Sequence, residues 1–106
     1  MKEKIKLKDF LKDFGVNIKD IKKCRDLIVD FFCFFGFKII ESQNYRYIKS
    51  VSQRGDGQGY EIYYIFQRKS DSKYFYYYIY DVRIEEDKLE ECRQIVTTKW
   101  DFETNY

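Results

Sequence analysis

Few side chains in this sequence could do acid–base or metal chemistry, because the chain contains no histidine. Histidine is the commonest general base and metal ligand, and it also activates serine and cysteine nucleophiles. Three cysteines are present, Cys24, Cys33 and Cys92, but they form no Cys-x-x-Cys pair of the kind that binds zinc. We therefore expect free thiols in a reducing compartment and a cytoplasmic location.

The carboxylates are the remaining candidates for catalysis. Asp81 is followed by Glu86-Asp87-Lys88, a spacing similar to that of metal-dependent nucleases, in which two acids hold Mg²⁺ and a lysine stabilises charge. In this sequence the acids stand at the start of a predicted helix, where the helix dipole favours negative charge. That role accounts for them without a metal, so we predict no catalytic residue, no cofactor and no metal site.

One glycine-rich loop, residues 54–59, resembles a ligand-binding loop, since its three glycines free backbone N–H groups to face an anion. Nucleotide-binding loops of this kind open a helix, whereas this one leads into a predicted strand that begins at Tyr60. We interpret it as the tip of a hairpin with a charged end, which is a common place for contact with a partner. Arg54 and Asp56 are its candidate contact residues.

Tyrosine is the most unusual feature of the composition, because eleven tyrosines, ten phenylalanines and one tryptophan make up 21% of the chain. In the segment YFYYYIY, residues 74–80, alternate tyrosines share one face of a predicted strand. Tyrosine provides a large contact area with few rotatable bonds, which is typical of protein-binding surfaces. We therefore predict a partner-binding site on this strand, the glycine loop and acids of a predicted C-terminal helix: Tyr74, Tyr76, Tyr78, Tyr80, Arg54, Asp56, Glu86, Glu90 and Glu91.

Three other uses of the aromatic strands remain open. Tyrosines beside cations on an open sheet could bind single-stranded RNA or DNA, although the ribonucleoprotein-type consensus is absent. The strand 74–80 could instead pair with a second copy, in a homodimer or a self-assembling structural subunit. The tyrosines could also simply stabilise the sheet through cross-strand pairs. The residues of the nucleic-acid alternative would be Tyr63, Tyr77, Arg46, Arg68, Lys69 and Arg83.

The elements that must position these residues follow from the spacing of apolar side chains. Apolar residues at helical spacing predict a first helix over residues 7–14, ended by Gly15, and a second over residues 17–36, capped by Asn17. The period then changes to two, and the intervening segments are short turns. This pattern predicts an antiparallel meander of four strands, at residues 37–42, 45–53, 60–69 and 74–84.

The C-terminal part of the chain admits two interpretations. The acids at 85–87, with Leu89, Cys92 and Val96 on one face, predict a third helix to about residue 97. Alternatively, the β-branched residues 95–98 begin an extended tail that returns Trp100 and Phe102 to the body.

With the third helix, the predicted fold is α+β: two N-terminal helices, a four-stranded antiparallel meander sheet and a C-terminal helix. No linker divides the sequence, so residues 1–106 form a single predicted domain. The predicted core consists of Ile28, Phe31, Phe32, Phe35, Ile39, Ile62 and Ile65.

The net charge does not indicate a class of partner, because 20 Lys+Arg against 18 Asp+Glu give a formal charge of only +2. The longest apolar run, residues 31–37, is too short to span a membrane, so we predict no membrane contact. The small size, the α+β character and the lysine-, isoleucine- and tyrosine-rich composition resemble those of small phage and mobile-element proteins, among them anti-CRISPR and related anti-defence inhibitors. The resemblance implies a non-enzymatic protein that inhibits a nuclease or CRISPR effector by binding to its surface in the host cytoplasm.

Overall fold

The computed structural model describes residues 2–33, 41–54, 60–80, 84, 86–95 and 99–102. Two short helices and six strands lie in this part of the chain. In chain order they are β1 (Lys4–Lys6), α1 (Leu7–Asp13), α2 (Arg25–Cys33), β2 (Tyr45–Arg54), β3 (Tyr60–Arg68), β4 (Tyr74–Tyr80), β5 (Lys88–Ile95) and β6 (Lys99–Asp101). None of the described helices is long and apolar enough to cross a membrane.

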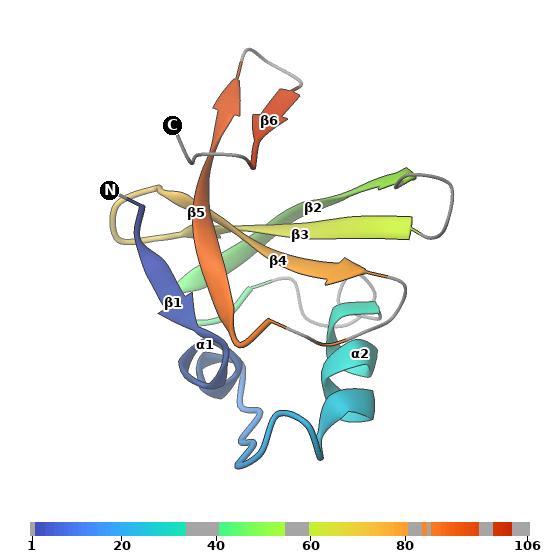
Figure 1. Cartoon of the computed structure of the whole chain (residues 1–106). Coiled ribbons are helices and arrows are strands. Elements are labelled where there is room, and N and C mark those ends of the chain that lie inside the picture. The colour runs from blue at the N-terminus through green and yellow to red at the C-terminus, as the bar shows by residue number, and fades with distance from the viewer. Residues whose placement is uncertain are drawn as a thin grey trace.

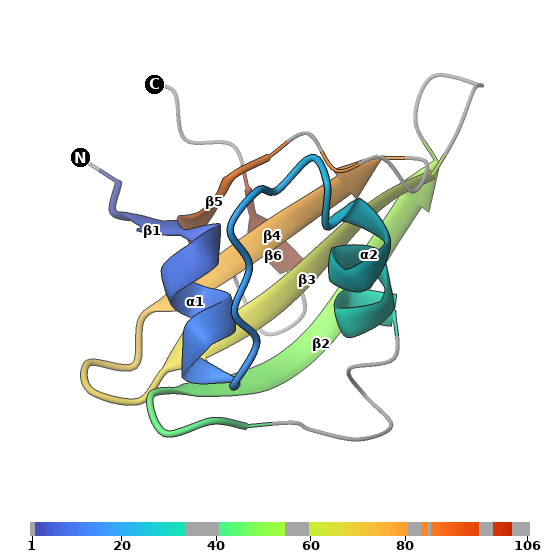
Figure 2. The same ribbon diagram turned by 90° about the horizontal axis from the view of Figure 1, so that it is seen from below.

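The strands form an antiparallel sheet in the order β1-β5-β4-β3-β2 (Figure 1). The N-terminal strand β1 pairs with β5, so the two ends of the chain meet in the sheet. The short strand β6 pairs with the last residues of β5, beyond the stretch of β5 that pairs with β4. Both helices lie on one side of the sheet, whereas β6 lies on the other side (Figure 2).

Helix α1 forms where the sequence predicts it. Leu7, Phe10 and Leu11 recur at helical spacing, and all three are fully buried. The helix begins where the N–H of Leu7 donates to the carbonyl of Asp87, 2.8 Å away, which joins it to the start of β5. It ends before Gly15, whose φ of +83° is the left-handed conformation that glycine adopts without strain.

Helix α2 begins at Arg25, seven residues after Ile18, which would be the first helical residue after an Asn17 cap. Asp20 is the residue that organises the preceding turn, because its Oδ1 accepts hydrogen bonds from the N–H groups of Lys22 (2.9 Å) and Lys23 (3.4 Å). This local bonding competes with an earlier helix start, as short polar side chains commonly do. The predicted continuation to residue 36 lies outside the described residues beyond Cys33.

The predicted four-stranded meander with a C-terminal helix is wrong. Its last three strands correspond to β2, β3 and β4, while its first, residues 37–42, lies outside the described residues except for Glu41, which bridges to Arg46, and Ser42. The predicted third helix is instead strand β5. Leu89 packs into the core beneath the helices and Cys92 is buried on the other face of the sheet, so both residues are explained by a strand covered on two sides.

The alternative interpretation of the C-terminus describes the chain better, since β6 is extended and Trp100 and Phe102 contact the body of the sheet. Strand β5 is stabilised by hydrogen bonds to β1 and β4. A prediction from the local spacing of apolar residues does not include these partners.

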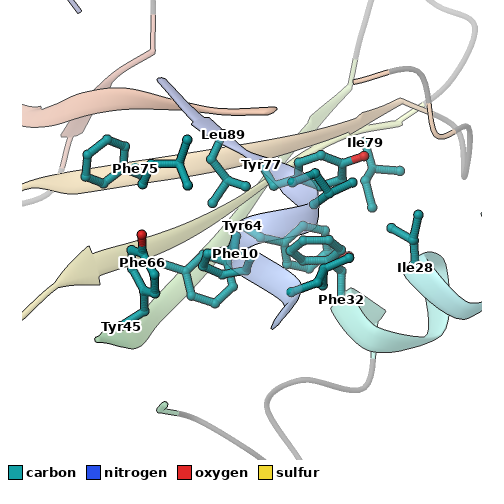
Figure 3. Close-up of a cluster of buried hydrophobic side chains, with 13 residues drawn as sticks. Phe10, Ile28, Phe32, Tyr45, Tyr64, Phe66, Phe75, Tyr77, Ile79 and Leu89 are labelled. Atoms are coloured by element: carbon teal, nitrogen blue, oxygen red, sulfur yellow. The ribbon is translucent and has the colours of Figure 1, made fainter. Parts of the chain in front are cut away.

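The core lies between the helices and the sheet, and it is largely aromatic (Figure 3). Phe10 from α1 and Phe32 from α2 contact Phe66 of β3, with ring centroids 4.7 Å and 6.1 Å from it. Of the predicted core, Ile28, Phe32 and Ile65 are buried, Phe31 and Ile62 are partly buried, and Phe35 and Ile39 lie outside the described residues. Ile65 faces away from this cluster, toward the other side of the sheet, as its cross-strand partner shows.

Candidate functional site

The face of the sheet opposite the helices carries a set of tyrosines from two neighbouring strands. Side chains alternate between the two faces along a strand, and paired residues of antiparallel strands share a face. In the pairing of β3 with β4, Tyr63 lies opposite Tyr78 and Glu61 lies opposite Tyr80. We call this surface the tyrosine face, and it contains Tyr63, Tyr74, Tyr76, Tyr78 and Tyr80.

The C-terminal segment folds over part of the tyrosine face. Trp100 of β6 meets Tyr74 edge-on, with ring centroids 4.8 Å apart. Phe102 stacks on Tyr63 with centroids 4.1 Å apart and ring planes within 10°, and it meets Tyr76 edge-on at 5.1 Å. This cover explains why the tyrosines are half-buried and why Ile65, which lies opposite Tyr76, is fully buried on a face that no helix covers.

A hollow of about 180 Å³ opens at the edge of this cover. Four aromatic side chains and three charged ones line it: Tyr63, Tyr76, Tyr78, Phe102, Glu86, Lys88 and Glu90. Glu90 belongs to β5 and lies opposite Tyr76 across the strand pair, and Lys88 is on the same face two residues earlier. The walls are therefore aromatic, and the charged groups come from β5 and the residues just before it.

Two of the tyrosine hydroxyls at the hollow, those of Tyr76 and Tyr78, donate hydrogen bonds to acceptors around it. Tyr76 Oη lies 3.1 Å from Glu90 Oε2 and 3.3 Å from the carbonyl of Phe102, and Tyr78 Oη donates to Glu61 Oε1 over 3.1 Å. Burial, and then the neighbouring carboxylates, raise the pKa of both Tyr76 and Tyr78. Both phenols are therefore neutral donors at physiological pH, and Glu90 keeps its second carboxylate oxygen, Oε1, for another donor.

Most of the residues that were predicted to bind a partner lie close together in the structure. Glu86 and Glu90 lie at the hollow with the tyrosines, while Glu91 does not, because it points to the opposite face. There Glu91 Oε1 accepts the N–H of Glu3 at 3.0 Å, which holds the N-terminal strand against β5. The side chain of Arg54 and the whole of Asp56 lie outside the described residues.

The residues of the nucleic-acid alternative are dispersed. Tyr63 is on the tyrosine face, but Tyr77 is fully buried under the helices. Arg68 binds the carboxylates of Glu3 and Asp71, and Lys69 forms an ion pair with Glu41. Arg46 is exposed on β2, and Arg83 lies outside the described residues. Arg46 shares the tyrosine face with Tyr63, since it lies opposite Gln67 and Gln67 lies opposite Tyr74, but the described members do not all lie on one surface.

Three residues of the site were missed by the sequence-based site prediction: Glu61, Lys88 and Phe102. Glu61 has a signal in the sequence, because a meander with a short turn places it near the tyrosines of the next strand. Lys88 and Phe102 depend on the true path of the C-terminal segment, which a predicted helix places elsewhere. Phe102 had only the signal of its spacing from Trp100, since the two alternate as aromatic residues do on one face of an extended segment.

No family model matches this chain, and no curated protein sequence or solved structure is significantly similar to it. Within the described ranges, no three His, Cys, Asp or Glu side chains come together as ligands for a metal ion. All three cysteines are free thiols, of which Cys92 is buried and Cys33 is exposed.

Proposed function

We propose that this chain is a small, non-enzymatic protein-binding module whose contact surface is the tyrosine face around the hollow. The observation that carries the proposal is that a face free of helices holds a cluster of half-buried tyrosines beside two carboxylates. Half-buried tyrosines are already ordered by their neighbours, so they lose little conformational freedom when a partner covers them. Such rigid aromatic side chains are the usual energetic centres of protein interfaces.

The partner that we propose is a large nucleic-acid-handling complex, such as a nuclease or CRISPR effector, which the chain would inhibit. This class comes from the resemblance in size and composition to small anti-defence proteins. The chemistry of the hollow supports it, because the nucleic-acid channels of such complexes are lined by lysine and arginine. Aromatic walls with carboxylates complement a surface of that kind.

Single-stranded nucleic acid is a poorer candidate for the ligand of this face. Arg68 and Lys69, the cations expected to hold phosphates, form ion pairs with acids of the chain itself. Next to the hollow, Glu61, Glu86 and Glu90 outnumber Lys88, and carboxylates repel a phosphate backbone; Arg46 and Lys49 of β2 lie on the same face of the sheet, farther from the hollow.

The strand Tyr74–Tyr80 offers few free backbone groups for pairing with a second copy. Strand β4 is paired with β3 along its length and with β5 over Tyr74–Tyr76, so this part is no open edge. In the described sheet, β2 is the edge strand beyond β3.

The test uses three folded baits: the wild-type chain, Tyr78→Ala on the tyrosine face, and Leu27→Ser as a matched control. Leu27 is 49% exposed on α2, on the other side of the sheet, so its replacement also removes an exposed apolar side chain. Each bait is titrated by calorimetry into purified CRISPR effectors and nucleases, and cleavage by each enzyme is measured in parallel. We expect wild-type and Leu27→Ser to bind and inhibit equally, and Tyr78→Ala to bind about tenfold or more weakly.

Equal binding by Tyr78→Ala and wild-type chain would move the interface to another surface and contradict the proposal. So would binding of single-stranded RNA or DNA that weakens steeply with salt, in the absence of any binding to protein. Light scattering of the free chain over a range of concentrations detects self-association. Self-association that Tyr78→Ala abolishes, with no binding to any other protein, would contradict the proposal.

A further inference from the structure

We infer that the hollow on the tyrosine face is a socket for one cationic side chain of the partner, an arginine in particular. This inference rests on the proposed function and names the group that the face recognises. It follows from three properties of the hollow: the aromatic character of its walls, the charge of its rim and its size.

The walls of the hollow suit a cation. Tyr63 lies at the centre of an aromatic group, with its ring centroid 5.1 Å from that of Tyr78, 5.5 Å from that of Tyr76 and 4.1 Å from that of Phe102. Aromatic faces attract cations through their quadrupole, and several rings around one site form the kind of cage that binds ammonium and guanidinium groups. A planar guanidinium also stacks on aromatic rings, which favours arginine over lysine.

The charged groups of the rim leave a net negative charge. Glu86 and Glu90 line the hollow with Lys88, which gives two negative charges against one positive in its lining, while Lys4 of β1 lies opposite Glu90 on the same face outside that lining. Within the described part of the chain, neither glutamate has a lysine or arginine within ion-pair distance.

Other acids of the described chain differ in this respect. Glu3 and Asp71 bind Arg68, and Glu41 binds Lys69. The carboxylates beside the aromatic walls are thus available to a cation from outside. Glu90 is the better placed of the two, since Tyr76 already fixes one of its oxygens and leaves the other open.

The volume of the hollow fits a single side chain. Sites for drug-sized ligands measure about 300–1,000 Å³, whereas this hollow measures about 180 Å³. It therefore suits one amino-acid side chain presented by a protein, which is the form of ligand that the proposed function requires.

Lys88 provides an internal test of the sign of the charge. If the hollow binds a cation, the ammonium group of Lys88 repels it, and removing that charge strengthens binding. If the hollow binds an anion, the same change weakens binding. Glu90→Gln and Lys88→Met should therefore act in opposite directions, which a merely structural role of either residue would not produce.

The experiment titrates the full chain with N-acetyl-arginine amide, and follows the aromatic NMR signals of Tyr63, Tyr78 and Phe102. The neutral analogue N-acetyl-citrulline amide has the same shape without the charge and serves as the matched ligand control. We expect saturable shifts with a dissociation constant of about millimolar order for the arginine compound, because a single cation–π contact is weak. Glu90→Gln should weaken this binding about fivefold and Lys88→Met should strengthen it by a smaller factor.

Equal shifts with the citrulline compound, the absence of saturation, or saturation with inorganic phosphate instead would overturn the inference. Its failure is distinguishable from that of the proposed function. If a protein partner binds through the tyrosine face but Glu90→Gln and free arginine compound do not affect it, the socket is wrong and the protein-binding function stands. If the arginine compound binds and no protein partner does, the socket stands and the proposed function is wrong.

Discussion

The ring of Phe32 in α2 lies parallel to the ring of Tyr77 in β4, with centroids 4.4 Å apart and planes within 11° (Figure 3). Tyr77 Oη also donates a hydrogen bond of 2.7 Å to the carbonyl of Glu86, just before β5. One pair of rings therefore connects the second helix, the middle of the sheet and the segment that carries Glu86 to the hollow. Core stability and the shape of the site depend on the same contacts.

This arrangement predicts unequal effects of two substitutions. Phe32→Ala removes a fully buried ring and leaves a cavity, so we expect it to lower the free energy of unfolding by about 3–5 kcal/mol. Tyr77→Phe keeps the stacked ring and loses only the hydroxyl, so we expect a loss of about 1 kcal/mol. Urea unfolding followed by circular dichroism measures both, and similar losses for the two variants would contradict this account.

The carboxylates around Arg68 should contribute to the acid dependence of stability. Arg68 Nη1 donates to Glu3 Oε2 over 2.5 Å, and Nη2 donates to Asp71 Oδ2 over 2.7 Å. The hydrogen bond from Arg68 lowers the pKa of Glu3 and lowers that of Asp71 to about 2. A pKa that is lower in the folded than in the unfolded state stabilises the fold above the unfolded value, and this stabilisation is lost as the pH falls toward the folded value.

We therefore expect the melting temperature to fall between about pH 4 and about pH 2, and to fall less steeply in Asp71→Asn. Asp26→Asn is the matched control, since Asp26 is an exposed acid of α2. Thermal unfolding of the three proteins across this pH range gives the comparison. Parallel curves for Asp71→Asn and wild type would show that the Arg68 cluster does not carry the acid dependence.

The loss of stability at alkaline pH should come from the buried tyrosines. Burial raises the pKa of Tyr64, Tyr76 and Tyr77 above the ordinary value of 10.0. For an acid whose folded pKa is raised, the stabilisation is full below the unfolded pKa and is lost as the pH rises above it. We expect these phenols to ionise only as the chain unfolds, which a titration of tyrosinate absorbance alongside circular dichroism detects. Ionisation of all tyrosines near pH 10 without loss of structure would contradict the burial described here.

The sequence predicts those parts of the fold that local spacing determines. The helix at Leu7–Asp13 and the alternation of YFYYYIY follow from side-chain periods, and the cluster of Tyr74, Tyr76 and Tyr78 on one face follows with them. Strand β5 does not follow, because Leu89 and Cys92 have a spacing that fits a helix as well as a strand buried on both faces. Pairing with β4 and with β1, the latter some eighty residues away, distinguishes the two.

The candidate site was predictable to the same extent. Its tyrosines are visible in the sequence, whereas Glu91 was assigned to it wrongly, because on a helix it would lie beside Glu90 and on a strand it points to the opposite face. Phe102 depends on how the segment after β5 turns back over the sheet. The alternation of Trp100 and Phe102 indicates an extended segment, but it does not indicate which side chains of the sheet this segment covers.

Phe102 forms one wall of the hollow and also covers the sheet, so its replacement should affect both ligand binding and stability. Phe102→Ala removes the ring that stacks on Tyr63, so we expect a loss of about 1 kcal/mol in the free energy of unfolding. The same variant should lose most of the binding of N-acetyl-arginine amide, whereas Phe102→Tyr should retain it, since another aromatic ring can stack in the same place. Calorimetric titration of both variants measures this difference. Full binding by Phe102→Ala would mean that the remaining tyrosines suffice for the cation, and that Phe102 serves the stability of the sheet alone.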